Sequence, residues 1–145
     1  MRTLALDVGD RSIGLALSDE LGLTAQAFLT LTRRGLRADL AALAQIVEER
    51  QVGEVVVGLP LQLDGRAGPQ AEKVRGLAEA LRAALSVPVI FWDERLTTQA
   101  AERALIEGGV RRARRKQVVD QVAAALILQG YLDRKRHDRG PSDAG

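Results

Sequence analysis

The chain of 145 residues contains no cysteine, one histidine, and only one tryptophan, one tyrosine and two phenylalanines. Without cysteine, disulfides, thiol nucleophiles and cysteine-ligated metal sites are excluded, and a reducing compartment is consistent with the composition. The single histidine, His137, lies in a polar stretch near the C-terminus, so we expect it to be solvated rather than catalytic. With so few aromatic side chains, we expect stacking on bases to be secondary to recognition of a backbone or a shape.

Long hydrophobic runs are also missing. The longest uninterrupted run extends from Val122 to Leu128, far short of the roughly 20 residues that a membrane span needs. Asp7 and Asp10 interrupt the N-terminal segment too early for a secretory signal. We therefore expect a soluble cytoplasmic protein with no membrane partner.

The net charge is only +2, but its distribution is uneven. Residues 1–94 carry 10 basic and 13 acidic side chains, whereas residues 95–145 carry 11 basic and 6 acidic ones. This asymmetry favours a polyanionic partner such as nucleic acid for one end of the molecule. A solvated basic face without a partner is the alternative.

The hydrophobic pattern predicts an α/β protein of one domain over residues 1–134, followed by a disordered polar tail at 135–145. Three antiparallel strands come first and βαβ units follow, giving a mixed five-stranded sheet with helices on both faces. The predicted strands are 3–8, 12–19, 24–32, 54–59 and 87–92, and the predicted helices are 36–51, 70–85, 97–107 and 116–134.

Three carboxylates lie in or beside apolar elements. Asp7 and Glu94 stand near the ends of predicted strands, and Asp120 lies on the apolar side of the last helix. A buried acid requires compensation for the loss of water, and a divalent metal ion provides it. Three acids converging from three elements would form a metal-dependent site that cleaves phosphodiester bonds, a reaction that needs no histidine base.

Each acid also has a structural alternative. Asp7 could begin the hairpin turn, although Asp10 is the better turn former. Asp93 and Glu94 must point to opposite sides of the strand, so only one can join Asp7, and the pattern alone does not choose between them. Asp120 could instead form an ion pair with Arg95, Arg115 or Lys116.

Residues 110–116 are predicted to form a basic loop, in which residues 111–116 read Arg-Arg-Ala-Arg-Arg-Lys. The arginine fork suits phosphate because it binds two oxygens at once. The run immediately precedes the helix of Asp120, so a bound strand would pass the proposed metal site. A flexible, solvated loop is the alternative.

Four motifs together resemble the YqgF/RuvX family of the ribonuclease H-like superfamily. Leu6-Asp7-Val8-Gly9-Asp10-Arg11-Ser12-Ile13-Gly14-Leu15-Ala16 is similar to the family's opening signature, and Val57-Gly58-Leu59-Pro60-Leu61 to its second motif. Asp93-Glu94-Arg95-Leu96-Thr97-Thr98 is similar to the third, and Lys116 with Asp120-Gln121-Val122-Ala123-Ala124 to the fourth. The match runs in order from about residue 3 to residue 134.

The resemblance implies a ribonuclease H-like fold and a hydrolase acting on ester bonds, with Mg²⁺ or Mn²⁺ as cofactor. It implies Asp7, Glu94 and Asp120 as catalytic, metal-binding acids, and so selects Glu94 over Asp93. Supporting positions are Gly9, Gly58, Thr97 and Thr98. The expected contacts to nucleic acid are Arg11, Arg95, Arg111, Arg112, Arg114, Arg115 and Lys116.

Nuclease maturation of the 5′ end of pre-16S ribosomal RNA is the activity that the resemblance implies, with structured RNA and ribosomal particles as partners. Cleavage of four-way DNA junctions is an alternative, and it requires a symmetric homodimer. A non-catalytic nucleic-acid-binding protein is another, although it would be expected to lack one of the acids. An ATP-handling protein of the actin, sugar-kinase and Hsp70 type would need a second such domain, for which the chain is too short.

Overall fold

A computed structural model describes residues 1–62, 64–96 and 112–139, the side chains of residues 96, 112–120 and 138–139 excepted. The chain begins with three antiparallel strands, β1 (Arg2–Val8), β2 (Ser12–Ser18) and β3 (Ala25–Thr32). A tight turn joins the first two, where the N–H of Gly9 donates a 2.8 Å hydrogen bond to the carbonyl of Ser12. The predicted three-strand start is confirmed.

Helices and strands then alternate, as predicted. Helix α1 and strand β4 come first, then helix α2, strand β5 and a short 3₁₀ helix, η1, and the last helix is α4. Their bounds are α1 Leu36–Glu49, β4 Val52–Leu59, α2 Pro69–Ala84, β5 Val89–Asp93, η1 Glu94–Leu96 and α4 Arg112–Arg139. The helix predicted at 97–107 lies outside the described residues.

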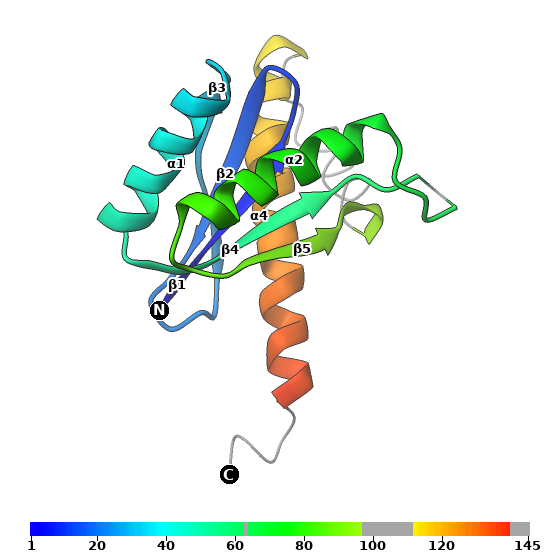
Figure 1. The fold of residues 1–145 in the computed structure, drawn as a ribbon. Coiled ribbons are helices and arrows are strands. Elements are labelled where there is room, and N and C mark those ends of the chain that lie inside the picture. Colours follow the sequence, from blue (N-terminus) through cyan, green and yellow to red (C-terminus); the bar gives the residue numbers. More distant parts are fainter. Residues whose placement is uncertain (63, 97–111, 140–145) are drawn as a thin grey trace.

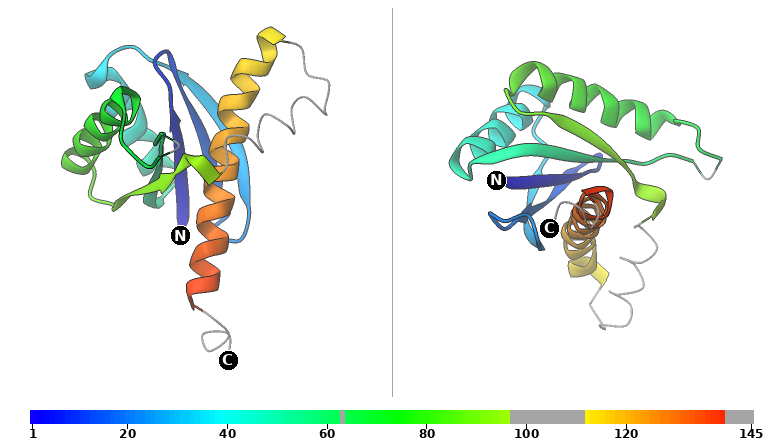
Figure 2. Two further views of the ribbon diagram at one scale, coloured as in Figure 1. Left: turned by 90° about the vertical axis from the view of Figure 1, so that its right-hand side faces the viewer. Right: turned by 90° about the horizontal axis from the view of Figure 1, so that it is seen from below.

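The five strands form one mixed sheet in the order β3-β2-β1-β4-β5, in which β4 runs parallel to both β1 and β5. Figure 1 shows α1 and α2 on one side of this sheet and α4 crossing the other. The view from below in Figure 2 separates the three layers most clearly. The predicted mixed sheet with helices on both faces is confirmed, and β1 is its central strand.

The two faces of the sheet differ in the size of their side chains. Leu4 and Leu6 of β1 are fully buried in a core of large aliphatic residues beneath α1 and α2. On the other face, Ala5 belongs to a smaller core with Ala124 and Ile127 of α4. Because side chains alternate along a strand, Asp7 must point toward α4.

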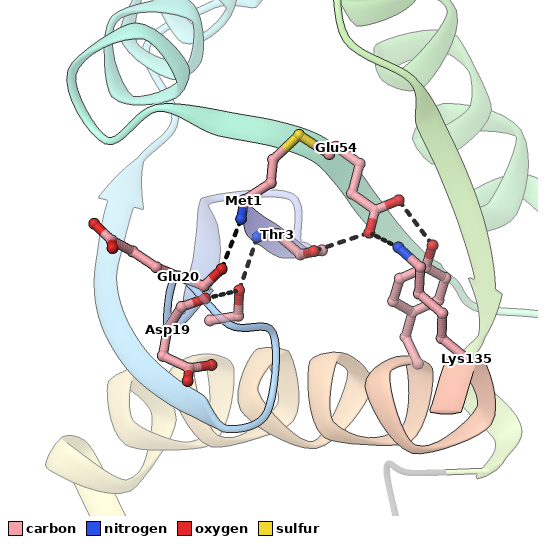
Figure 3. Close-up of polar contacts among 8 residues, drawn as sticks. Met1, Thr3, Asp19, Glu20, Glu54 and Lys135 are labelled. Atoms are coloured by element: carbon pink, nitrogen blue, oxygen red, sulfur yellow. Dashed lines mark hydrogen bonds and ion pairs between the residues drawn. The ribbon is translucent and has the colours of Figure 1, made fainter. Parts of the chain in front are cut away.

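A buried ionic network fixes the far end of α4 to the sheet (Figure 3). Glu54 of β4 is buried and accepts hydrogen bonds from the Thr3 hydroxyl at 2.9 Å, the Tyr131 hydroxyl at 2.8 Å and the Lys135 ammonium at 2.9 Å. Burial opposes ionisation of Glu54, but these donors outweigh it and lower the pKa of its carboxyl below the ordinary value. The charge is therefore fully compensated inside the protein.

Helix α4 is longer than predicted at both ends. Residues 112–115 of the basic run are helical rather than a loop, and residues 135–139 are helical rather than the start of a disordered tail. Arginine and lysine are good helix formers, so a run of charge does not by itself end a helix. The Lys135–Glu54 ion pair also holds the extension against the sheet. Among the described residues, no helix combines the length and the apolar character that crossing a membrane requires.

Candidate active site

Two glycines flank Asp7 on the neighbouring strands. Asp7 is half-buried one residue before the end of β1 and pairs with Gly14 of β2. On the other side, Leu6 pairs with Val57 of β4, so Gly58 is the next neighbour of Asp7 on the same face. Since neither glycine has a side chain, the sheet leaves space around the Asp7 carboxylate on the face that α4 covers.

Glu94 fills part of this space. It is the first residue of η1, directly after β5, and is only 9% exposed. A Cβ atom placed on Gly58 would lie 2.8 Å from Cγ of Glu94 and 2.6 Å from Cδ1 of Ile127 in α4. Glu94 therefore reaches back over Gly58, between the sheet and α4, and the contact depends on glycine at this position.

The carboxyl groups of Asp7 and Glu94 contact each other. Burial of Glu94, its hydrogen bond with Asp7 and the negative charge of Asp7 together raise the pKa of Glu94 to about 9. Near neutral pH, the pair therefore shares a proton rather than carrying two negative charges. The structure thus brings together two of the three predicted acids, and it places Glu94, not Asp93, beside Asp7.

Asp93 turns away to a different partner. Its carboxylate accepts hydrogen bonds from Nε of Arg95 at 2.9 Å and from Nη2 of Arg95 at 2.6 Å. The guanidinium of Arg95 is the main cause that lowers the pKa of Asp93. As expected from the sequence, the side chains of Asp93 and Glu94 point to opposite sides. Asp93 therefore forms an ion pair with Arg95, whereas Glu94 meets the carboxyl group of Asp7.

Asp120 lies in α4, but its side chain is outside the described part of the structure. Its neighbour Gln121 donates a 3.1 Å hydrogen bond to the hydroxyl of Thr30 in β3. Thr30 pairs with Gly14, which in turn pairs with Asp7. The backbone of α4 at residue 120 is therefore level with the row of the sheet that contains Asp7.

The paired acids suit a hard divalent cation. Carboxylate oxygens are the ligands that Mg²⁺ and Mn²⁺ prefer, and the repulsion that the shared proton relieves could equally be relieved by a cation. Among the side chains that the structure describes, no group of three or more such ligands forms. Asp7 and Glu94 thus fit two ligands of a metal site that needs further oxygen donors.

A second ion pair, which the sequence analysis missed, holds the turn that follows Asp7. Arg33, just after β3, donates to the Gly9 carbonyl at 2.9 Å and to the buried Asp39 carboxylate at 2.8 Å. Asp39 also accepts the backbone N–H of Arg34 at 2.9 Å. The Gly9 carbonyl is therefore fixed by a buried carboxylate acting through Arg33. Asp39 comes three residues after Leu36 and four before Leu43, so it shares a helix stripe with these leucines. This spacing is the sequence signal that could have identified Asp39 as a buried acid.

The predicted nucleic-acid contacts are only partly described. Arg11 is exposed in the β1–β2 turn, directly after β1. Arg95 is exposed beside Asp93, directly after β5, at the same end of the sheet. The remaining predicted basic residues in the described chain belong to the first turns of α4, where the backbone alone is described; they are Arg112, Arg114, Arg115 and Lys116. Arg111, Thr97 and Thr98 lie outside the described residues.

The fold is shared with proteins that resolve four-way DNA junctions. A structure titled as Thermus thermophilus RuvC in complex with Holliday junction substrate superposes with a TM-score of 0.58 at 20% identity, covering 88% of this chain and 91% of that one. A fowlpox virus resolvase in complex with Holliday junction DNA gives a TM-score of 0.53 at 13% identity, covering 92% of this chain and 97% of that one. This likeness assigns the ribonuclease H-like fold.

Sequence relatives define the family within this fold class. The model of the RuvX family, described as a Holliday junction resolvase, matches residues 1–134. A protein of Myxococcus xanthus is 56% identical over 136 residues, which cover 94% of this chain and 90% of its own. One of Moorella thermoacetica is 58% identical over 134 residues, covering 92% of this chain and 96% of its own. Both bear the name "Putative pre-16S rRNA nuclease".

The chain therefore belongs to the RuvX family. Its membership confirms the resemblance derived from the four motifs, and with it the predicted class of enzyme, a nuclease that hydrolyses phosphodiester bonds. The fold class also implies dependence on a divalent metal in general terms.

Replacing Gly58 by alanine should destabilise the protein, because the new methyl group would meet Glu94 and Ile127 below van der Waals distance. We expect a loss of about 1–3 kcal/mol in the free energy of unfolding, measured by urea denaturation. Gly76→Ala is the matched control, since a Cβ there meets nothing within 4 Å in helix α2 and should be neutral or stabilising. Equal stability of the two variants would show that Gly58 does not constrain Glu94.

The pKa of Glu94 predicts a dependence of stability on pH in chelator. Between its ordinary value of 4.5 and about 9, the folded chain holds a proton that the unfolded chain releases, so the free energy of unfolding falls as pH rises. Glu94→Gln mimics the protonated form, so its stability advantage over the wild type should widen by at least about 1 kcal/mol from about pH 5.5 to about pH 8.5.

The exposed Glu48 provides a matched control, as Glu48→Gln should show no such widening. Added Mg²⁺ or Mn²⁺ should then stabilise the wild type more than Glu94→Gln, because only the wild type keeps both carboxylates. A pH-independent difference between wild type and Glu94→Gln would contradict the contact between the two acids.

Proposed function

We propose that Asp7, Glu94 and Asp120 hold Mg²⁺ or Mn²⁺ and form the catalytic centre of this nuclease. The observation that carries the proposal is the contact between the carboxyl groups of Asp7, in β1, and Glu94, directly after β5. Both acids stand at the carboxyl ends of parallel strands, where α/β sheets place their sites. The position of residue 120 in α4, level with the row of Asp7, supports the third ligand.

The roles of the protein residues follow from their environments. When bound, the metal would stabilise negative charge on the phosphate and assist ionisation of the attacking water. Asp7 and Glu94 would bind and orient it, while Arg33 and Asp39 keep the Gly9 turn in place. The exposed His137 lies near the far end of α4, so no histidine base is assigned to the reaction.

We propose precursor 16S ribosomal RNA as the substrate, with maturation of its 5′ end as the role. Relatives more than half identical over nearly the whole chain are named as pre-16S rRNA nucleases, which supports the choice of substrate. Cleavage of four-way DNA junctions is the second candidate, favoured by the description of the family model and by the fold of the resolvases. Ribosomal particles would be partners in the first role, and a homodimer would be required in the second.

Asp7→Asn should abolish cleavage while the protein stays folded and still binds nucleic acid, because the change removes a metal ligand but no basic residue. We expect a loss of at least about 100-fold in the rate of cleavage. Two labelled substrates serve in parallel, a ribosomal RNA precursor with the small-subunit 5′ leader and a mobile four-way DNA junction, each with Mg²⁺, Mn²⁺ or chelator.

Asp10→Asn is the matched control, since Asp10 is exposed in the same turn and pairs only loosely with Lys73 at 3.6 Å. It should retain most of the activity. Metal-dependent cutting of the RNA alone supports the processing role, and paired symmetric cuts in the junction support the resolvase. Turnover of Asp7→Asn at the wild-type rate would disprove the assigned centre, and the absence of cleavage of either substrate by the wild type would favour the non-catalytic binding protein.

The basic run at residues 111–116 predicts a salt-dependent interaction with nucleic acid. Neutralising Arg111, Arg112, Arg114 and Arg115 together should flatten the dependence of log K on log salt for duplex DNA by up to about 0.9 for each lost phosphate contact. Binding isotherms over a range of salt concentrations measure this slope. An unchanged slope would identify the run as a solvated surface of the helix.

A further inference from the structure

A pocket of about 380 Å³ lies between strand β5, at the edge of the sheet, and the C-terminal half of α4. It brings together the side chains of Trp92 and Tyr131, whereas the ring of Phe91 packs on the opposite face of the sheet beneath Arg82. The lining residues are Ile90, Phe91, Trp92, Asp93, Tyr131, Arg134 and Lys135. This grouping was not expected from the sequence, in which Trp92 and Tyr131 are 39 positions apart.

The aromatic walls are held in place from behind. A Cβ atom on Gly130 would lie only 2.8 Å from Cζ2 of Trp92, so the indole packs directly against the backbone of α4. Its Nε1 is buried and has no hydrogen-bond partner among the described residues, so packing alone fixes the ring. Tyr131 is fixed at its hydroxyl, which donates a 2.8 Å hydrogen bond to Glu54. Ordering a ligand against such rings costs little rearrangement of the protein.

The charges around the pocket leave one cation available. Asp93 is neutralised by Arg95, and Lys135 pairs with Glu54 and lies 5.7 Å above the Tyr131 ring. Arg134 is exposed and makes no ion pair with any residue that the structure describes. An arginine at the rim of an aromatic pocket suits a ligand that combines a flat ring with a phosphate.

We propose that this pocket binds one nucleobase and an adjoining phosphate of a single-stranded segment of the substrate, with the base against Trp92 or Tyr131 and the phosphate on Arg134. Trp92 contacts α4 at Gly130, and Glu94 lies beside Ile127, about one helical turn earlier in α4. The pocket therefore lies on the same side of the sheet as the candidate metal centre. The inference rests on the proposed nuclease function for the class of substrate, but it concerns a site apart from the three acids.

The single tryptophan makes this pocket directly observable, because fluorescence of Trp92 reports on nothing else in the chain. The full-length protein is titrated in chelator with adenosine 5′-monophosphate, ribose 5-phosphate and a short single-stranded oligoadenylate. A saturable quench is expected with the oligonucleotide and, more weakly, with the mononucleotide. Ribose 5-phosphate should give none, because it has no base to stack.

Arg134→Gln should weaken oligonucleotide binding about tenfold, as expected for loss of a charge-assisted hydrogen bond, and lower its salt slope by about 0.7. Arg136→Gln is the matched control, since Arg136 carries the same charge on the same helix, pairs with Asp133 and does not line the pocket. It should bind almost as the wild type does. Both residues are exposed, so neither change should affect folding.

Absence of quenching by the oligonucleotide would overturn the proposal, as would an equal quench by ribose 5-phosphate or equal weakening in the two arginine variants. The titration needs neither metal nor cleavage, so its outcome is separate from that of the nuclease assay. Cleavage without quenching would disprove nucleobase binding in the pocket and support the nuclease function. Quenching without cleavage of any substrate would support nucleobase binding and disprove the proposed catalytic role.

Discussion

The contact between two carboxyl groups, those of Asp7 and Glu94, is the constraint on which the arrangement of this end of the molecule depends. Two like charges at a buried position repel unless a proton or a cation lies between them. To bring them together, β1 and β5 must end at the same end of the sheet, on either side of β4, and both side chains must lie on the same face. Glycine at position 58 is then needed on β4, because any side chain there would occupy the volume of Glu94.

Small side chains also line other parts of the face of the sheet that α4 covers. Ala5 and Ala124 are fully buried there, and small residues let the helix lie close to the strands. Large aliphatic residues fill the opposite face beneath α1 and α2. The site thus lies on the face with small side chains, where the backbone of α4 can approach the carboxylate of Asp7. Most of the apolar surface that stabilises the fold is buried on the other face, beneath α1 and α2.

Local pattern predicted most of the fold, because alternating and helical periodicities are properties of neighbouring residues. The same logic located Asp7 and the adjacent acids Asp93 and Glu94 near strand ends, but the choice of Glu94 over Asp93 came from the family resemblance. What it could not supply was any fact that depends on distant residues meeting. Trp92 and Tyr131 share a pocket only because α4 crosses β5, and Arg33 reaches Gly9 only because β3 ends beside the β1–β2 turn. The start of α4 was misjudged because charge was taken as a sign of a loop, although arginine and lysine favour helices. Its end was misjudged because the polar tail with Gly140-Pro141 was taken as disordered from residue 135.

Two buried acids in this protein show how structural and functional carboxylates can be told apart. Glu54 and Glu94 both lie on the α4 face, and burial opposes the charge of each. Around Glu54 the protein supplies a hydroxyl, a phenol and an ammonium, and the pKa of its carboxyl is lowered. Around Glu94 it supplies another carboxyl group, and the pKa is raised. A fold gains nothing in stability from the second arrangement, and the metal ion proposed for this site would relieve the repulsion that it creates.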